Sequence, residues 1–458
     1  MNKTAVIDVV GLSASLIGDH MPFLKAYTSS RNLVTIEPML PAVTTAVQST
    51  YLTGKWPSEH GIVGNGWYDR EECEVKFWKQ SNKWVLAEKI WEKAKREDPS
   101  FSCAQMFWWY NMYSSADYSV TPRPNYLADG RKIPDCYSHP AGLRDYLQEK
   151  LGQFPLFHFW GPGADIRSTR WIADASILTD QQYDPTLSLI YLPHLDYCLQ
   201  KYGPDLSRIS AELQAVDQVI KDLVQYYEGR KAEVIILSEY GIAPVSRPIH
   251  LNRLFREQGL LQIRVERGLE LLDAGASRAF AVADHQVAHV YINDPSCTGE
   301  VLSLLEKVKG VDLIMDREAQ AAHHIDHQRA GDLVVTADRD SWFTYYFWLD
   351  DAKAPDYARC VDIHKKPGYD PVEMFMSSKW RAAYKLLRKK AGFRYVMDVI
   401  PLDATLIKGS HGITGTDTSF HPVLISGRRP LQSPLQAIDV FDVLWQTLSA
   451  PAHDKPGT

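Results

Sequence analysis

Five short apolar runs set the strongest constraint on how this chain can fold. Most of their residues are β-branched, which is typical of strands that are buried on both faces. The runs are Thr4–Val10, Leu187–Leu192, Val234–Leu237, Leu333–Thr336 and Val423–Ser426. Between them, Ala211–Tyr227 has the apolar spacing of an amphipathic helix, and Leu435–Leu448 has it less regularly. Strands that alternate with helices predict an α/β fold with a mainly parallel sheet.

Composition excludes several classes of protein. Of the 458 residues, 45% are hydrophobic and 23% are charged, as in ordinary globular proteins, so disorder, collagen and coiled coil do not describe the whole chain. The formal net charge of −6 argues against a duplex nucleic-acid partner. The first apolar run is interrupted by Asp8 and is too short for a secretory signal or a membrane span. We therefore expect a cytoplasmic protein with free thiols and no membrane partner.

Two stretches interrupt the alternation of strands and helices. Residues 67–144 are rich in aromatic side chains, and residues 279–370 contain six histidines. We interpret both as insertions over the sheet, which leaves residues 1–66, 145–278 and 371–458 as the α/β core. In the first insertion, Trp108, Trp109 and Tyr110 either form its core or provide a wall on which a planar group stacks.

Polar residues follow several of the expected strands. Asp8 lies within the first run, Asp196 follows the second, Glu239 follows the third, and His411 lies between glycines near the C-terminus. A buried carboxylate without a partner is costly, so Asp8 either caps a loop or binds a metal. Each of these residues alone is more often structural than catalytic. Because they gather at strand ends, together they predict a metal cluster.

A hydroxyl group stands at the start of an expected short helix. Thr44 follows a turn that begins at Pro41, and the helical run closes at Gly54. Thr44 is either a helix cap or a nucleophile, because a hydroxyl at a helix N-terminus faces an anion site and can ionise on a metal. Asn65 is either a loop residue or a donor to a phosphoryl oxygen.

The stretch Pro41–Asn65 contains Pro-x-x-Thr, Thr-Gly, Pro-x-x-His-Gly-Ile and a final Asn. It resembles the type I phosphodiesterase/nucleotide pyrophosphatase family of the alkaline phosphatase superfamily. The resemblance implies an alkaline-phosphatase-like, mainly parallel sheet sandwiched by helices, with inserted cap segments. It also implies two divalent metal ions.

The same resemblance implies roles for individual residues. Asp8 is expected to be a metal ligand, Thr44 both a metal ligand and the nucleophile, and Asn65 a contact to the phosphoryl group. Asp196 and His411 are expected to bind the other metal ion.

The chain departs from the family pattern at three of its ligand positions. The family's Asp-x-x-x-His ends here in Gln200, and its Asp-His-Gly becomes Glu239-Tyr240-Gly241. Glu239 can still bind a metal ion, whereas tyrosine is a poor ligand unless it is ionised. The loss of histidine makes zinc less favourable and harder ions such as Mg²⁺ or Mn²⁺ more favourable. The roles of Gln200 and Tyr240 stay open.

Neighbouring residues offer replacement ligands. His364 is either a ligand or a residue of the cap or substrate site. On an extended strand His194 would share a face with Asp196. Two further groups have alternatives. The cluster of His323, His324 and His327 either binds a metal ion or lies on a solvated face. Lys365 and Lys366 are either surface charges or hold a second phosphate.

The expected function is metal-dependent hydrolysis of phosphoric esters or anhydrides with a threonine nucleophile, acting on a small phosphorylated or nucleotide-like substrate. The alternatives are a phosphoryl transferase or mutase, a phosphonate or sulfate hydrolase, and a degenerate, non-catalytic binding protein. The sequence leaves the natural substrate, the oligomeric state and the choice among Zn²⁺, Mn²⁺ and Mg²⁺ open.

Overall fold

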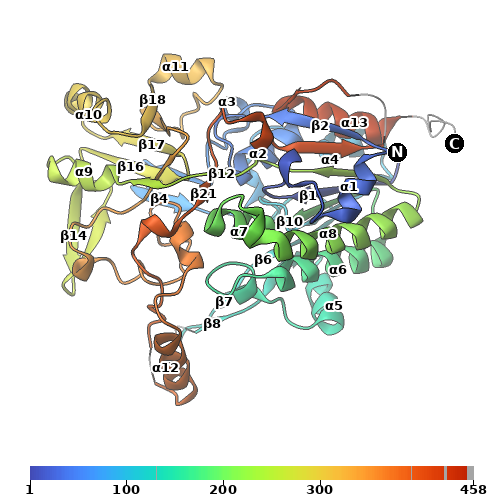
Figure 1. Ribbon diagram of the computed structural model, residues 1–458, viewed down its shortest axis with the longest axis horizontal. Coiled ribbons are helices and arrows are strands. Elements are labelled where there is room, and N and C mark those ends of the chain that lie inside the picture. The colour runs from blue at the N-terminus through green and yellow to red at the C-terminus, as the bar shows by residue number, and fades with distance from the viewer. Residues whose placement is uncertain (130, 394, 428–430, 451–458) are drawn as a thin grey trace.

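A nine-stranded sheet forms the centre of the molecule (Figure 1). The computed structural model describes residues 1–458 except 130, 394, 428–430 and 451–458. The strand order is β23-β2-β22-β11-β1-β10-β5-β6-β9. In chain order the strands are β1 (Thr4–Val9), β2 (Asn32–Glu37), β5 (Cys103–Met106), β6 (Tyr118–Pro122), β9 (Cys136–His139), β10 (Leu187–Leu192), β11 (Glu233–Leu237), β22 (Val423–Ser426) and β23 (Leu435–Gln436).

The predicted α/β fold with a mainly parallel sheet is confirmed. β11, β1, β10, β5 and β6 run parallel to one another, while β22 and β9 are antiparallel to their neighbours. Four of the five apolar runs supply strands of this sheet. The fifth run forms β19 (Leu333–Ala337), which belongs to a separate sheet, because short apolar runs show that a strand is buried without showing where it pairs.

Helices cover both faces of the sheet (Figure 1). One layer contains α2 (Thr44–Thr53), α4 (Ile90–Glu97) and α13 (Val440–Ser449). The other contains α1 (Pro22–Thr28), α5 (Ala141–Leu151), α6 (Ile166–Tyr183), α7 (His194–Tyr202) and α8 (Leu206–Gly229). The helix expected around Ala211–Tyr227 is α8, whose buried residues include Leu213, Val216 and Ile220.

The prediction that residues 67–144 form an insertion over the sheet is wrong for much of that stretch. β5, β6 and β9 lie inside it and form one side of the central sheet. Their sequences, such as Cys103-Ala104-Gln105-Met106, are short and contain polar residues, so they lack the β-branched signal of the other strands. The hairpin of β3 (Gly66–Asp69) and β4 (Glu74–Phe77) lies outside the central sheet.

A second, four-stranded antiparallel sheet lies beside the first (Figure 1). It contains β16 (Ala279–Asp284), β17 (Val287–Ile292), β18 (Val311–Met315) and β19. The remaining α-helices are α3 (Pro57–His60), α9 (Leu251–Glu257), α10 (Thr298–Leu305), α11 (Arg317–Ala322) and α12 (Lys379–Lys390). The remaining strands form pairs: β7 (Asn125–Tyr126) with β8 (Lys132–Ile133), β12 (Ala243–Pro244) with β21 (Gly409–Ser410), β13 (Arg247–Ile249) with β20 (Ser341–Phe343), and β14 (Gln262–Glu266) with β15 (Leu269–Asp273).

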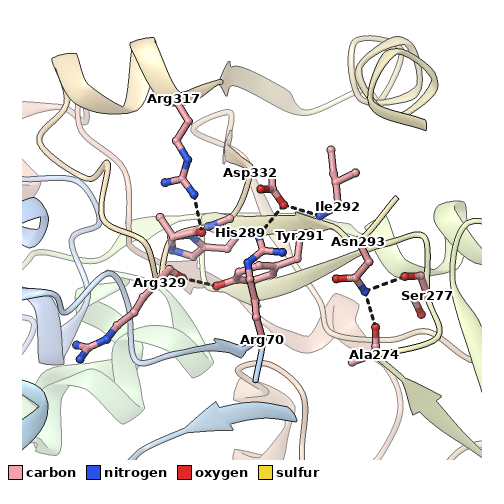
Figure 2. A network of polar contacts seen from close by, with 12 residues as sticks. Arg70, Ala274, Ser277, His289, Tyr291, Ile292, Asn293, Arg317, Arg329 and Asp332 are labelled. Atoms are coloured by element: carbon pink, nitrogen blue, oxygen red, sulfur yellow. Dashed lines mark hydrogen bonds and ion pairs between the residues drawn. The ribbon is translucent and has the colours of Figure 1, made fainter. Parts of the chain in front are cut away.

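Polar contacts fix the second sheet against the core. His289 accepts a hydrogen bond from the backbone N–H of Gly331 at Nδ1, so Nε2 carries the proton that it donates to the carbonyl of Val63 at 2.9 Å. Figure 2 shows His289 within a network that also joins the hydroxyl of Tyr291 to the carbonyl of Arg329. The contact between His289 and Val63 therefore joins β17 to the segment that contains Asn65, and the contact of Tyr291 fixes the backbone of Arg329 against the same strand.

Among the described residues, no helix is both long enough and apolar enough to cross a membrane. The six cysteines are free thiols, as expected.

Candidate active site

The parallel strands bring acidic residues from distant parts of the chain to one edge of the sheet. Asp8 in β1 is paired in register with Tyr191 of β10 and Leu237 of β11. Glu239 lies two residues beyond the end of β11, and Asp196 lies in α7, which follows β10. The carboxyl ends of adjacent parallel strands meet at one edge, where ligands bind in such folds. Asp8, Glu239 and Asp196 therefore lie at the same edge of the sheet, and their role as metal ligands stays a prediction.

Thr44 is the first residue of α2. The residue before it, Val43, is the extended N-cap, so Thr44 itself is not the cap. The side chain of Thr44 is 3% exposed, and its hydroxyl oxygen is 3.0 Å from the hydroxyl of Tyr240. Asn65 is held beside it, because its Oδ1 accepts a hydrogen bond from the backbone N–H of Thr45. The helix start therefore presents a buried hydroxyl next to an amide.

Asp8 and Glu239 form a buried pair of carboxyl groups. Burial raises the pKa of Asp8 to about 7, and burial together with the negative charge of Asp8 raises the pKa of Glu239 well above its ordinary value. Gln48 of α2 donates from Nε2 to Oε1 of Glu239 at 2.6 Å and to Oδ2 of Asp8 at 3.3 Å. Its Oε1 accepts from the backbone N–H of Trp109 at 2.8 Å, which fixes the direction of the amide.

The remaining oxygens of this pair suit a hard cation. Asp8 Oδ1 and Glu239 Oε2 are buried, and neither has a hydrogen-bond partner within the described part of the chain. No lysine or arginine in that part forms an ion pair with either acid. With the hydroxyl of Thr44 they make an oxygen-only donor set, which fits Mg²⁺ or Mn²⁺ better than zinc. Gln48 would then not bind the cation itself but would orient the two carboxylates that do.

The second expected metal position has a poorer donor set. Gln200 donates from Nε2 to Asp196 at 2.8 Å and accepts from Tyr369 at Oε1, so its donor faces the acid. His411 Nε2 is 3.8 Å from Asp196 Oδ1 and has no hydrogen-bond partner among the described residues. Of the ligands that the family pattern implies for this position, only Asp196 and His411 are kept, which is fewer than the three or four protein ligands of a zinc site. Among the described residues, no group of three or more His, Cys, Asp or Glu side chains is placed to hold a metal ion.

Tyr240 lies between the two positions. Its ring stacks on His411 with the centroids 3.5 Å apart, and its hydroxyl donates to Asp196 at 3.3 Å. The next residue, Gly241, has no room for a side chain, because a Cβ there would overlap the carbonyl of Phe420. The Glu-Tyr-Gly sequence is therefore fixed closely against the C-terminal part of the chain.

Sequence reasoning missed Asp284 and His285. Asp284 accepts from both the backbone N–H and the side-chain amide of Asn65, at 2.8 and 3.1 Å. It also contacts Nδ1 of His285, whose ring lies 3.8 Å from that of His411. His285 has a φ of 61°, a left-handed conformation that is uncommon for residues other than glycine and that occurs often at functional sites. The adjacent Asp-His pair in the β16–β17 turn is the signal that was available.

The structure places the other candidate residues as follows. His194 does not share a face with Asp196, because both lie in α7 rather than on an extended strand, and His194 contacts Glu212 instead. The polar contact of His364 is with the carbonyl of Phe77, so its assignment as a ligand stays a prediction. Lys366 is not a surface charge, because it is buried and pairs with Asp370 and Glu373.

Aromatic rings continue outward from the site. Trp109, whose backbone holds Gln48, has its ring centroid 4.7 Å from that of Trp78. Trp78 contacts Tyr369, and Tyr369 stacks on His285 at 3.7 Å. Trp78 and Trp109 are only partly buried, while Trp108 is fully buried core. Of the aromatic run noted in the sequence, Trp109 thus adjoins the site through Gln48, and the hydroxyl of Tyr110 lies close to Thr45.

Comparisons with known proteins show what the chain is similar to. The family described as type I phosphodiesterase/nucleotide pyrophosphatase matches residues 4–370. An ectonucleotide pyrophosphatase/phosphodiesterase of Saccharomyces cerevisiae is 24% identical over 99% of this chain and 83% of its own. An uncharacterized pyrophosphatase/phosphodiesterase of Schizosaccharomyces pombe is 28% identical over 48% of this chain, a match that spans 40% of the relative.

Two solved structures share the fold across nearly the whole chain. Murine ectonucleotide pyrophosphatase/phosphodiesterase 5, in complex with AMP, has a TM-score of 0.60 and 14% identity, and the match covers 100% of this chain and 98% of that one. Phosphonoacetate hydrolase of Sinorhizobium meliloti, in complex with phosphonoacetate, has a TM-score of 0.62 and 15% identity, with coverage of 98% and 96%. At these identities the likeness concerns the fold alone.

Proposed function

Because this chain belongs to the type I phosphodiesterase/nucleotide pyrophosphatase family, a group of hydrolases in the alkaline phosphatase superfamily, we propose that it cleaves phosphoric esters or anhydrides with Thr44 as the nucleophile. One observation carries the proposal: the buried hydroxyl of Thr44 begins α2 beside the acid pair Asp8–Glu239. A hydroxyl in this position can attack a phosphorus atom that the helix N-terminus holds.

Each residue of the site has its own role in the proposed reaction. The oxygen of Thr44 forms a bond to phosphorus as the bond to the leaving oxygen breaks, and water then releases the phosphoryl group from Thr44. The proton of the Thr44 hydroxyl has a route to the oxygen of Tyr240, whose own hydroxyl contacts Asp196. One N–H of the Asn65 amide is held by Asp284, which leaves the other for a phosphoryl oxygen.

Asp8, Glu239 and Thr44 would hold a divalent cation of the Mg²⁺ or Mn²⁺ type, which would lower the pKa of the Thr44 hydroxyl and offset the charge of the two acids. Gln48 keeps both carboxylates in position through its fixed amide. Asp196 and His411 would contribute to a second ion together with substrate oxygens. The oxygen-rich donor set is what supports this assignment over a pair of zinc ions.

The substrate class that we propose is a phosphorylated compound with a planar group, such as a nucleotide. The aromatic run from His285 through Tyr369 and Trp78 to Trp109 supports this, because a base can stack on such rings. The related murine structure contains AMP.

A second candidate function is nucleotide binding without turnover. Two positions that hold metal-binding histidines in the family pattern are occupied here by Gln200 and Tyr240, and both make hydrogen bonds within the protein. A chain that has lost these ligands can keep the anion site at α2 and the aromatic run while losing the reaction.

The test is turnover of p-nitrophenyl mono- and diesters in Mg²⁺, Mn²⁺ or Zn²⁺, compared with binding of AMP by calorimetry. We expect Thr44→Ala to lose about a thousandfold or more in kcat while AMP still binds. Thr44→Ser is the matched control, because it keeps a hydroxyl. Phosphorylation of Thr44 in acid-quenched protein would be seen as a mass increase in the corresponding peptide.

Undiminished turnover by Thr44→Ala would contradict the nucleophile assignment. No turnover by the unaltered protein in any of the three ions, with AMP binding retained, would favour the binding protein over the hydrolase.

A further inference from the structure

The helix α12 presents its apolar side to solvent. Trp380, Tyr384 and Leu387 are 86%, 56% and 65% exposed. Their spacing of four and three residues puts them on one face of the helix. The buried residue of α12 is Ala382, which lies on the opposite side. Surface helices ordinarily bury their apolar stripe against the core, so α12 has the reverse orientation.

Ion pairs fix that orientation. Arg381 and Lys385 both pair with Asp398, and the Lys385 Nζ to Asp398 Oδ1 distance is 2.7 Å. Of the two, Lys385 lies on the side of Ala382. The helix lies at the end of an arm that projects from the body of the molecule (Figure 1). The apolar stripe therefore faces away from the protein.

The charge of α12 contrasts with that of the whole chain. Its twelve residues include six lysines and arginines and no acid, although the chain has a formal net charge of −6. Lys379 and Lys390 flank one edge of the apolar stripe on the helical projection. Beyond the helix, Phe393 and Val396 add exposed apolar side chains, at 61% and 51%.

We propose that α12 binds an anionic phospholipid surface. Trp380, Tyr384 and Leu387 enter the boundary between headgroups and acyl chains, while Lys379 and Lys390 contact lipid phosphates. Basic residues beside a stripe that contains tryptophan and leucine are typical of helices that lie in the plane of a membrane interface. This proposal replaces the sequence-based expectation of no membrane partner, and it does not depend on the proposed hydrolase activity.

Charge favours lipid over a second copy of the chain as the occupant of this face. A symmetric dimer would place the basic stripes of two α12 helices against each other, and like charges across an interface are unfavourable. An anionic lipid surface is complementary both to the basic residues and to the apolar stripe.

The experiment is flotation of the full-length protein with vesicles of phosphatidylcholine alone or with about one third phosphatidylserine. We expect about tenfold tighter binding to the anionic vesicles, weakened by about 0.5 M NaCl. Trp380→Ser/Leu387→Ser and Lys379→Glu/Lys390→Glu should each reduce binding about tenfold. The matched controls are Val265→Ser, at an equally exposed apolar residue, and Lys307→Glu/Lys309→Glu, which makes the same change in net charge.

A fluorescence measurement tests the proposal even if one of the double variants fails to fold. Brominated lipid should quench the fluorescence of the unaltered protein, and Trp380→Phe should lose that quenching. Equal binding to both vesicle types, unchanged binding by the two α12 double variants, or no quenching would overturn the proposal. So would a concentration-dependent dimer that Trp380→Ser/Leu387→Ser abolishes, with no binding to vesicles.

Discussion

The amide nitrogen of Gln48 lies 2.6 Å from a carboxylate oxygen of Glu239. The same nitrogen reaches Asp8, and the backbone of Trp109 fixes the amide from its other side. Two buried acids, one in β1 and one just beyond β11, are thus held with one oxygen each engaged and the other without a partner among the described residues. This arrangement leads to specific expectations for cation binding.

Gln48→Ala should weaken the binding of Mn²⁺ about 10- to 100-fold, because residues that orient ligating carboxylates have effects of that size. Isothermal titration calorimetry with Mn²⁺ and no substrate measures this directly. Ser49→Ala is the control on the same helix, since among the residues that the structure describes the Ser49 hydroxyl bonds only to the backbone carbonyl of Thr45. Equal Mn²⁺ affinity in Gln48→Ala and the unaltered protein would contradict the role given to Gln48.

Gln48→Glu should lower the melting temperature in the absence of metal, because it puts a third carboxylate beside two buried acids. Added Mn²⁺ should restore much of the loss, since a cation offsets the added charge. Differential scanning fluorimetry with Mn²⁺ or with a chelator separates the two states. A melting temperature that does not respond to Mn²⁺ would argue against a cation between Asp8 and Glu239.

Tyr240→His should bind zinc about tenfold or more tightly than the unaltered protein, because an imidazole nitrogen replaces a phenol that is a poor ligand. Burial raises the pKa of Tyr240 well above its ordinary value, so the phenol stays protonated at neutral pH. Equilibrium dialysis against Zn²⁺ measures the change, and Tyr240→Phe serves as the control without any ligand. If Tyr240→His and Tyr240→Phe bind zinc equally, the assignment of position 240 to a metal site is wrong.

Trp109→Ala should weaken AMP binding about tenfold while leaving the binding of inorganic phosphate within about twofold, because stacking on one aromatic ring contributes about 1–3 kcal/mol. Competition calorimetry with the two ligands tests this, and Trp380→Ala is a tryptophan control from α12. Because the backbone N–H that holds Gln48 is kept in Trp109→Ala, a parallel loss of both affinities would show that the Trp109 ring supports the structure of the site and does not act by stacking.

His289 should make the fold sensitive to acid. Burial lowers its pKa from 6.5 to about 4, so the folded state binds the proton less readily than the unfolded state. The stabilisation is therefore present above pH 6.5 and is lost as the pH falls toward 4, with a size of about 3 kcal/mol. Urea unfolding at pH 7 and pH 4.5 should show a smaller difference for His289→Gln than for the unaltered protein. His139→Gln, at an exposed histidine, should behave like the unaltered protein.

The sequence predicted the parts of the site that come from short local patterns. Asp8 lies near the end of β1, Glu239 lies just beyond β11 and Thr44 starts α2, and such boundaries leave signals in the local sequence. Asn65 lies in the loop before β3 and was indicated by the motif that ends the stretch Pro41–Asn65. The parallel sheet then places them together, because the carboxyl ends of its strands share one edge.

Long-range contacts explain what the sequence did not reveal. The role of Gln48 depends on the backbone of Trp109, 61 residues away, and Asp284 reaches Asn65 from 219 residues away. The start of α7 at His194 was also hidden, because the helix begins directly after Pro193 without a side-chain cap. The strand β5 was missed since its four residues lack a β-branched pattern.

The order of the strands has a consequence for how the protein is made. Asp8 is translated at the start of synthesis, and its strand can pair only when β10 and β11 have followed. His411 stacks on Tyr240 only after about nine tenths of the chain has been translated. β22, which pairs with both β2 and β11, is later still. A nascent chain or a truncated product that ends before His411 therefore contains Asp8 and Glu239 but lacks His411 and the strand that joins β2 to β11.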